Sequence, residues 1–235
     1  MGGGAQVVAL ARMGIDTVLV PTVLYGRHPG LGPPGGGAVE DAVFRGMLEG
    51  IVAEGAASRA DAILTGYFGS ADQVTAAASL IGEIKRSRNE TQIVVDPVIG
   101  DAPDGLYVPG EVAEAIAERL ITLADLVAPN AWELRHLTGE DDPRAGARRL
   151  GKPLLASSVD LGAELGVAWV GDGAAWLATH PRIESAPKGT GDRLTALFTG
   201  ARLLGHSPYE ALRRAVEAIA GDLPGAEPVR IGPLP

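Results

Sequence analysis

Short runs of β-branched residues alternate along this chain with longer segments of helical periodicity. This alternation is typical of a mostly parallel sheet with helices on both faces, because parallel neighbours need a crossover between them. Strands are predicted at Asp16–Pro21, Asp61–Thr65, Gln92–Asp96, Asp125–Ala128, Pro153–Ser157, Gly166–Val170 and Ala174–Ala178. Helices are predicted at Ala38–Glu54, Ala71–Arg88, Pro109–Thr122, Asn130–Leu137, Asp142–Leu150, Asp192–Leu204 and Pro208–Ala220. The sequence therefore predicts an α/β fold of three αβα layers, with residues 1–235 in one domain.

Two connecting segments have distinctive turn residues. The Asp-Gly pair in Gly171-Asp172-Gly173 is a strong hairpin signal, so the sheet is expected to be mixed at that end. Pro29–Gly37 consists of proline, glycine and one leucine, which leaves few side chains that can pack. We interpret it as a mobile surface loop.

The charge balance limits the partners that this chain can have. A net charge of −9 without a basic run argues against nucleic acid or an anionic membrane as a partner. No apolar run approaches the roughly 18 to 20 residues that cross a bilayer, so we expect a soluble protein, by default in the cytoplasm. The absence of cysteine excludes disulfides, thiolate metal sites and a cysteine nucleophile.

The run Lys188-Gly189-Thr190-Gly191-Asp192 leads directly into an apolar helical segment. Its glycines let backbone N–H groups converge, and the start of the helix adds the positive end of its dipole, which favours an anion. Asp192 could then accept a proton from a hydroxyl while the turn holds a phosphoryl group. The alternative is an ordinary tight turn with Asp192 as the helix N-cap.

Further carboxylates follow two neighbouring predicted strands. Asp96 ends one strand, and Asn130 and Glu133 follow the next. Because ligands gather at the carboxyl ends of parallel strands, Asp96 and Glu133 are candidate magnesium ligands beside a nucleotide. The structural alternative is that Asp96 starts a turn while Asn130 and Glu133 form a capping box.

Five runs follow one another in order along the chain: Gly66-Tyr67-Phe68-Gly69-Ser70-Ala71, Asp96-Pro97-Val98-Ile99-Gly100-Asp101, Gly105-Leu106-Tyr107-Val108-Pro109, Ala128-Pro129-Asn130-Ala131-Trp132-Glu133-Leu134 and Gly189-Thr190-Gly191-Asp192. Taken together, these runs resemble the pyridoxal kinases of the ribokinase-like superfamily over most of the chain. The resemblance implies ATP-dependent phosphorylation of the 5′-hydroxyl of pyridoxal, and of pyridoxine or pyridoxamine, by a homodimer that uses Mg²⁺.

The resemblance also implies a role for each matching residue. Asp192 is expected to be the catalytic base, and Gly189, Thr190 and Gly191 to form the anion hole. Magnesium is assigned to Asp96 and Glu133. ATP is expected to contact Asp96, Asp101, Tyr107, Asn130, Glu133, Ser157 and Ser158. The vitamer is expected to contact Thr22, His28, Tyr67 and Asp192, with His28 either on the pyridine ring or simply exposed in the loop.

Three features depart from the family pattern. Only Met1-Gly2-Gly3-Gly4 stands where the family has a first strand and a glycine-rich turn, so we expect either a start further upstream or a degenerate relative. Ala156 replaces the usual threonine, which could remove a phosphate contact or pass it to Ser157. Arg193 follows the catalytic aspartate and either faces solvent, screening Asp192, or touches phosphate.

Two other functions stay open. Another ribokinase-like kinase, acting on hydroxymethylpyrimidine or a sugar, would share most of these motifs. A non-catalytic protein that binds a vitamer or nucleotide would fit the shortened start. A kinase assay with pyridoxal distinguishes them.

Overall fold

The computed structural model describes residues 2–182, 189–222 and 228–235. Its main sheet has seven strands in the order β11-β10-β9-β8-β7-β4-β3. Their bounds are β3 (Ala62–Thr65), β4 (Gln92–Val95), β7 (Leu126–Val127), β8 (Leu154–Asp160), β9 (Glu164–Gly171), β10 (Ala174–Pro181) and β11 (Arg230–Pro233). Pairing is parallel from β3 to β8 and antiparallel from β8 to β11, so β3, β4, β7, β8 and β10 run in one direction.

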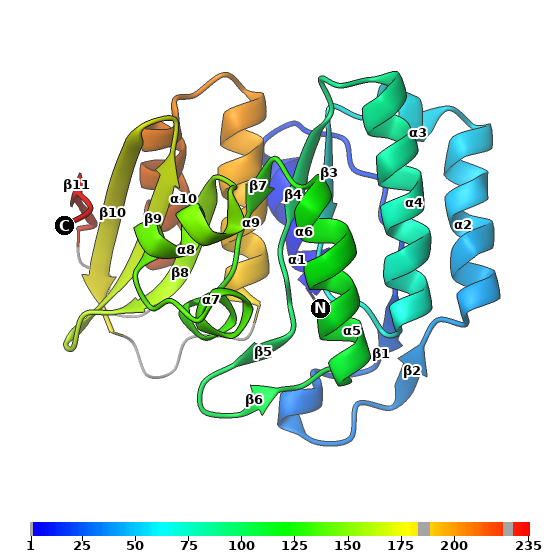
Figure 1. Ribbon diagram of the computed structural model, residues 1–235, viewed down its shortest axis with the longest axis horizontal. Helices are drawn as coiled ribbons and strands as arrows, with labels where there is room; N and C mark the ends of the chain where they lie inside the picture. Colours follow the sequence, from blue (N-terminus) through cyan, green and yellow to red (C-terminus); the bar gives the residue numbers. More distant parts are fainter. Residues whose placement is uncertain (1, 183–188, 223–227) are drawn as a thin grey trace.

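Helices cover both faces of this sheet (Figure 1). One face carries α1 (Gly2–Arg12), α9 (Thr190–Leu203) and α10 (Pro208–Gly221), which pack on one another. The other face carries α2 (Asp41–Ala53), α4 (Ala71–Ser87), α5 (Gly110–Ala115), α6 (Ile121–Leu123), α7 (Ala131–Thr138) and α8 (Pro143–Leu150), with the single turn α3 (Ala56–Arg59) after α2. The predicted α/β fold with helices on both faces of a mostly parallel sheet is confirmed.

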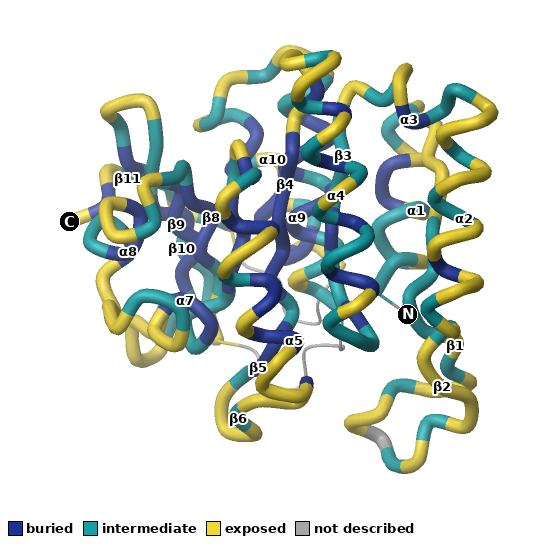
Figure 2. The backbone as a smooth tube through the Cα atoms, turned by 45° about the vertical axis from the view of Figure 1, so that its right-hand side comes forward, coloured by how far each residue is buried: buried dark blue, intermediate teal, exposed yellow. Residues whose placement is uncertain are grey.

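The two cores follow the two-residue period of the strands. On β8, Leu154 and Ala156 join the core under α4, α5 and α7, whereas Leu155 joins the core formed with α9 and α10. Successive side chains of a strand point to opposite faces, and both faces here are covered. Much of the central strands is accordingly buried, including residues 93–95 of β4 and 154–156 of β8, while the outer faces of the helices are exposed (Figure 2).

Six of the predicted strands and all seven predicted helices are present, with shifted ends. The Asp-Gly hairpin is also confirmed: β9 and β10 are joined at Asp172 and Gly173, whose φ angles are 49° and 74°. The predicted helix Pro109–Thr122 is a continuous run of α5, a π-helical turn η2 (Ile116–Leu120) and α6.

The predicted strand Asp16–Pro21 is wrong. This segment pairs with no strand among the described residues, and its apolar residues Val18 and Leu19 are 65% and 51% exposed. A run of β-branched residues favours an extended backbone, but a strand also needs a neighbour for its N–H and C=O groups. The described sheet ends at β3.

The loop prediction for Pro29–Gly37 is partly wrong. A short 3₁₀ helix, η1 (Pro29–Leu31), lies inside it, and its last residues belong to β2 (Gly36–Ala38), which pairs with β1 (Val23–Tyr25). Gly36 has φ 111°, and a Cβ there would collide with the Leu24 carbonyl, so this approach requires glycine. This pairing also delays the start of α2, because Ala38 belongs to the hairpin.

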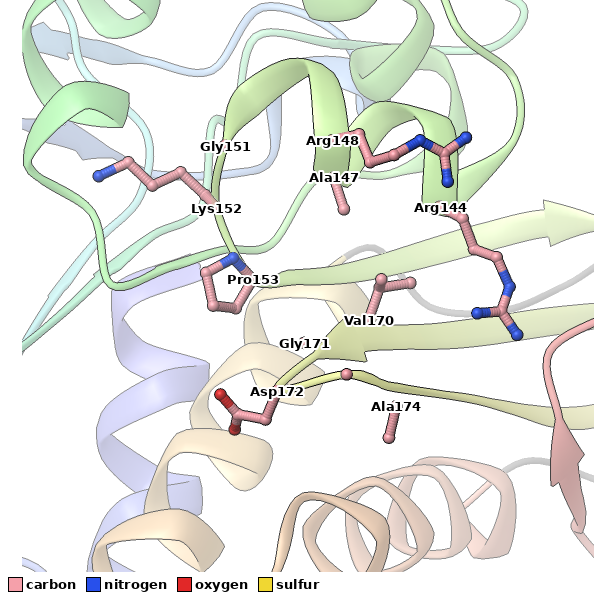
Figure 3. A pocket seen from close by; sticks show the side chains of 11 residues that line it. Arg144, Ala147, Arg148, Gly151, Lys152, Pro153, Val170, Gly171, Asp172 and Ala174 are labelled. Carbon is pink, nitrogen blue, oxygen red and sulfur yellow. The ribbon is translucent and has the colours of Figure 1, made fainter.

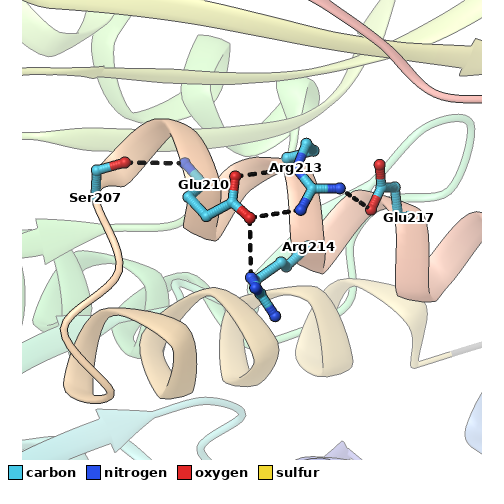
Figure 4. Close-up of polar contacts among 5 residues, drawn as sticks. All are labelled: Ser207, Glu210, Arg213, Arg214 and Glu217. Carbon is cyan, nitrogen blue, oxygen red and sulfur yellow. Dashed lines mark hydrogen bonds and ion pairs between the residues drawn. The ribbon is translucent and has the colours of Figure 1, made fainter.

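Hydrogen bonds and ion pairs between polar side chains run along the exposed side of helix α10 from its first turn (Figure 4). The Ser207 hydroxyl accepts the N–H of Glu210, and the Glu210 carboxylate binds Arg213 and Arg214. Arg213 also reaches Glu217 one turn later. Such exposed pairs stabilise a helix by only about 0.3–0.5 kcal/mol each, so the apolar face of α10 holds it in place.

The carboxyl ends of the parallel strands meet at the lower edge in Figure 1. Two small hairpins flank this edge: β1–β2 and the pair β5 (Gly100–Asp101) and β6 (Gly105–Leu106). None of the described helices is long and apolar enough to cross a membrane.

Candidate active site

Helix α9 places Asp192 at the edge described above. The helix begins at Thr190, two residues before the predicted start, and Asp192 is therefore its third residue. Gly189 precedes it with φ 93°, a left-handed conformation that glycine adopts without strain. Lys188, the first residue of the predicted turn, lies outside the described residues. The Asp192 carboxylate thus sits beside the first, unpaired amides of α9.

Two other segments close around the Asp192 carboxylate. At Gly2, the start of α1, an added Cβ would lie 2.7 Å from Asp192 Oδ1; at Gly66, directly after β3, it would lie 3.8 Å away. Burial raises the pKa of Asp192, and the nearby His28 imidazole acts in the opposite direction. A carboxyl group of raised pKa is a stronger base once ionised, which suits it to accept a proton from a hydroxyl.

Asp96 lies behind Asp192, at the end of β4. Its Oδ2 is 2.9 Å from the hydroxyl of Thr195, which is also 3.1 Å from the Gly191 carbonyl one turn earlier in α9. Burial and then the nearby carboxylates of Glu133 and Asp192 raise the pKa of Asp96 well above its usual value, while the hydrogen bond from Thr195 opposes this. Asp96 is therefore tied directly to the helix that carries Asp192.

Glu133 joins the start of α7 to the loop after β4. Its Oε2 accepts the N–H of Asn130 (2.8 Å), and its Oε1 accepts those of Ile99 (3.0 Å) and Gly100 (3.4 Å). Asn130 Oδ1 accepts the N–H of Glu133, which completes the capping box, and its Nδ2 donates to the Gly100 carbonyl. The structural alternative for Asn130 and Glu133 is thus correct, whatever else they bind.

Asp96 and Glu133, the two predicted magnesium ligands, both lie at this edge of the sheet. Burial raises the pKa of Glu133 to about 8, against its backbone hydrogen bonds. Among the described residues, no group of three or more acidic or imidazole side chains is arranged to hold a metal ion. Asp96 and Glu133 offer the hard oxygen atoms that Mg²⁺ prefers, so phosphate and water would have to supply the remaining ligands.

The β5–β6 hairpin carries Asp101 and leads into Tyr107. Asp101 Oδ1 accepts the N–H of Ala102, and Tyr107 is 46% exposed. Gly100 lies so close to Trp132 that a Cβ would overlap its ring, which fixes the hairpin against α7. The two predicted nucleotide contacts, Asp101 in the hairpin and Tyr107 directly after it, therefore lie at the same edge of the sheet as Glu133.

Ser157 and Ser158 lie in a β-bulge of β8. The register with β9 shifts between Ala156 and Val159, and Ser158 has φ 57°. Ser157 donates its N–H to the Pro129 carbonyl, which places it next to the turn before α7. Ala156 is fully buried, so a phosphate contact is not available from its position.

The predicted substrate residues cluster around the β1–β2 hairpin. The Thr22 hydroxyl donates to the Tyr67 carbonyl (2.6 Å), and Gln73 binds the carbonyls of Thr22 and Val39, which anchors the hairpin. Burial, and then the neighbouring Tyr25, raise the pKa of Tyr67 to about 12. His28 Nδ1 accepts the N–H of Gly30, so its Nε2 is the atom left for a ligand.

Four residues at this site were missed from the sequence: Gly2, Gln6, Thr65 and Thr195. Thr195 could have been found, because it lies three residues after Asp192 on the same helix face. Gln6 is a single polar residue in an apolar stretch, and Thr65 ends a strand. Neither carries a motif that connects it to Asp192.

Two pockets lie outside this arrangement. One, of about 370 Å³, lies between α8 and the β9–β10 turn, at the opposite end of β8, and includes Arg144, Arg148 and Asp172 (Figure 3). The other, of about 460 Å³, lies between α1, α9 and α10. Arg193 lines the second pocket and forms an ion pair with Asp222 at the end of α10.

Phosphoryl transfer needs alignment and charge neutralisation more than covalent help from the protein. Helix amides beside a carboxylate, at the ligand-binding edge of an α/β sheet, provide both. The fold and the site together define a small-molecule kinase.

Comparison with known proteins identifies the family. The family model described as phosphomethylpyrimidine kinase matches residues 39–232, and the chain belongs to this family. It is 37% identical to the pyridoxine/pyridoxal/pyridoxamine kinase of Bordetella avium, over 93% of this chain and 77% of that protein.

Solved structures agree with this assignment. The pyridoxal kinase of Leishmania donovani in complex with ADP and pyridoxamine has a TM-score of 0.81 and 26% identity, covering 93% of this chain and 79% of that one. The pyridoxal kinase of Entamoeba histolytica has a TM-score of 0.86 over 96% of this chain and 86% of that one, at 24% identity, and supports the fold alone.

Proposed function

We propose that this chain transfers the γ-phosphoryl group of ATP to the 5′-hydroxyl of pyridoxal, and of pyridoxine and pyridoxamine. The observation that carries the proposal is the position of Asp192 in the first turn of α9, enclosed by Gly2 and Gly66. The substrate class comes from the relatives, whose names specify B6 vitamers, and from the ADP and pyridoxamine bound to the Leishmania donovani enzyme.

In this proposal Asp192 accepts the proton of the substrate hydroxyl. The hydroxyl oxygen forms a bond to the γ-phosphorus, and the bond from that phosphorus to the β–γ bridging oxygen breaks, leaving ADP. The amides of Gly189, Thr190 and Gly191 face the charge on the transferred group, at the positive end of α9. Thr195 and Asp96 keep this helix turn in position relative to the sheet.

The nucleotide is assigned to the other half of the same edge. Asp101 and Tyr107 border it on the β5–β6 side, and Ser157 and Ser158 on the β8 bulge. Asn130 contributes through the turn that it caps. Asp96 and Glu133 would hold Mg²⁺ together with water and phosphate oxygens, and the ion would neutralise phosphate charge during transfer.

The vitamer is assigned to the side closed by the β1–β2 hairpin. Thr22 and Tyr67 would line the base of this site, held together by the hydrogen bond that the Thr22 hydroxyl donates to the Tyr67 carbonyl, and His28 Nε2 is available to the pyridine ring. His28 lies in the loop between β1 and β2, close enough to Asp192 to lower the pKa of that carboxyl group, and this proximity supports the placement.

A second candidate is a hydroxymethylpyrimidine kinase, since the matching family model is described as a phosphomethylpyrimidine kinase. The purified protein should be assayed with ATP and Mg²⁺ against pyridoxal, pyridoxine, pyridoxamine, hydroxymethylpyrimidine and ribose. We expect the highest kcat/KM with a B6 vitamer. A higher kcat/KM for hydroxymethylpyrimidine would transfer the proposal to that substrate. Tight vitamer binding without any product would instead support the non-catalytic alternative.

The homodimer that the resemblance implies and the cytoplasmic location expected by default both stay predictions. Light scattering on the purified protein at micromolar concentration measures the mass directly. We expect twice the mass of one chain of 24.1 kDa.

A further inference from the structure

Two buried polar side-chain atoms have no hydrogen-bond partner in the part of the chain that the structure describes. They are Nε2 of Gln6 in α1 and Oγ1 of Thr65 at the end of β3. Most buried polar atoms in proteins are paired, so an unpaired one calls for an explanation such as a missing ligand. The location of these two atoms suggests what that ligand is.

Gln6 and Asp192 border the same space. The Cβ position of Gly66 lies 3.8 Å from Gln6 Nε2 and 3.8 Å from Asp192 Oδ1. Thr65, whose hydroxyl is the other unpaired atom, immediately precedes Gly66. Because Gly66 has no side chain, the space between the Gln6 amide and the Asp192 carboxylate is not filled by this residue.

The course of α1 explains why Gln6 is there. Gly2 lies against the Asp192 carboxylate, and Gln6 follows it by four residues, one helical turn further on the same face. Leu10, one more turn along, is buried against α9 together with Ala9 and Ala196. This apolar contact holds α1 in place and keeps the Gln6 amide beside the site.

We propose that Gln6 is a substrate-positioning residue, whose side-chain amide donates a hydrogen bond to the oxygen of the hydroxyl that Asp192 deprotonates. A hydroxyl group both donates and accepts, so a carboxylate and an amide N–H placed around one space are complementary to it. The donor orients the oxygen and stabilises the negative charge that develops as the proton leaves. This inference rests on the proposed function, because the hydroxyl is the one that is phosphorylated.

Comparing the binding of two ligands, one with and one without the 5′-hydroxyl, tests the contact between that hydroxyl and the Gln6 amide. Pyridoxal and 5′-deoxypyridoxal differ by that hydroxyl, and their affinities should be measured by calorimetry for the wild type and for Gln6→Met, which keeps the length of the side chain without its donor. We expect Gln6→Met to weaken pyridoxal binding about tenfold and to leave 5′-deoxypyridoxal binding unchanged. The kcat/KM for pyridoxal should fall at least as far, with the KM for ATP unchanged.

Two further variants separate this contact from a general effect on α1. Val8→Ala changes an exposed residue of the same helix and should behave as the wild type. Gly66→Ala adds a methyl group at ordinary contact distance from both Gln6 and Asp192, so it should fold normally and raise the KM for pyridoxal. It therefore tests the space even if Gln6→Met were to misfold.

The possible outcomes are distinct. Equal losses for the two ligands, or no loss for pyridoxal, would overturn the role of Gln6 while leaving the proposed function in place. A wild type that binds pyridoxal without phosphorylating it would overturn the proposed function, and the ligand pair would still decide whether Gln6 contacts the hydroxyl. A wild type that binds neither ligand would overturn both.

Discussion

The hydroxyl oxygen of Thr195 lies 2.9 Å from Oδ2 of Asp96, although 99 positions separate the two residues in the chain. The same hydroxyl is 3.1 Å from the carbonyl of Gly191. Thr195 therefore joins the carboxyl end of β4 to the first turn of α9, where Asp192 lies. The geometry of the proposed base depends on a side chain that does not belong to any of the matched motifs.

Thr195→Val should remove this connection while keeping the shape of the side chain. Thr195 and Asp96 are both buried, so the variant leaves the Asp96 carboxyl without its partner. We expect the free energy of unfolding to fall by about 1–3 kcal/mol in urea titrations. Thr195→Ser keeps the hydroxyl and should lose less. Equal stability of the valine and serine variants would show that the hydrogen bond contributes nothing.

Asp192→Asn should lower kcat for pyridoxal by about 10²- to 10⁴-fold, which is the usual contribution of general acid–base catalysis. The amide keeps the size of the side chain but does not accept the proton. Ligand affinities, measured by calorimetry, should change little. Turnover close to that of the wild type would show that Asp192 is not the base.

Gly189→Ala should strain the start of α9. The φ of 93° at Gly189 disfavours any residue with a Cβ, at a cost of roughly 1–2 kcal/mol. We expect a matching loss in thermal or urea unfolding, together with a lower kcat because the first amides of α9 shift. Gly191→Ala is the control for stability: it lies within the helix and its added Cβ has nothing within 4 Å. A destabilisation by Gly191→Ala as large as that by Gly189→Ala would contradict this explanation.

The buried Glu133 should make stability depend on pH. Burial raises its pKa from 4.5 to about 8, so the folded protein retains a proton that the unfolded chain releases between these values. Its contribution to the free energy of unfolding is therefore complete below about pH 4.5 and is lost as pH rises towards 8.

Urea titrations at several pH values between 5 and 8 measure this effect by comparison with Glu133→Gln, which has no such proton to lose. We expect the stability of the wild type to fall relative to the variant as pH rises. Glu140→Gln, an exposed neighbour, is the control and should run parallel to the wild type. A constant difference between the wild type and Glu133→Gln across this range would exclude the raised pKa.

The elements that the sequence predicted well share one property: their pattern is decided locally. The Asp172-Gly173 turn is specified by residues that tolerate positive φ, and Asn130 and Glu133 form their capping box within one helical turn. The segment Asp16–Pro21 shows the limit. Its β-branched residues resemble those of a strand, but pairing depends on a neighbour that its own residues do not encode.

The same distinction applies to the candidate site. The sequence by itself determined the motif residues, including the glycine turn with Asp192, and through them the family and the class of chemistry. Only the tertiary structure decided which unmarked residues share the space around Asp192: Gly2, Gln6 and, through Asp96, Thr195. The physical reason is that a motif records local backbone geometry and residue chemistry. Contacts between a helix at the start of the chain and one near its end arise only when both pack on each other beside the sheet.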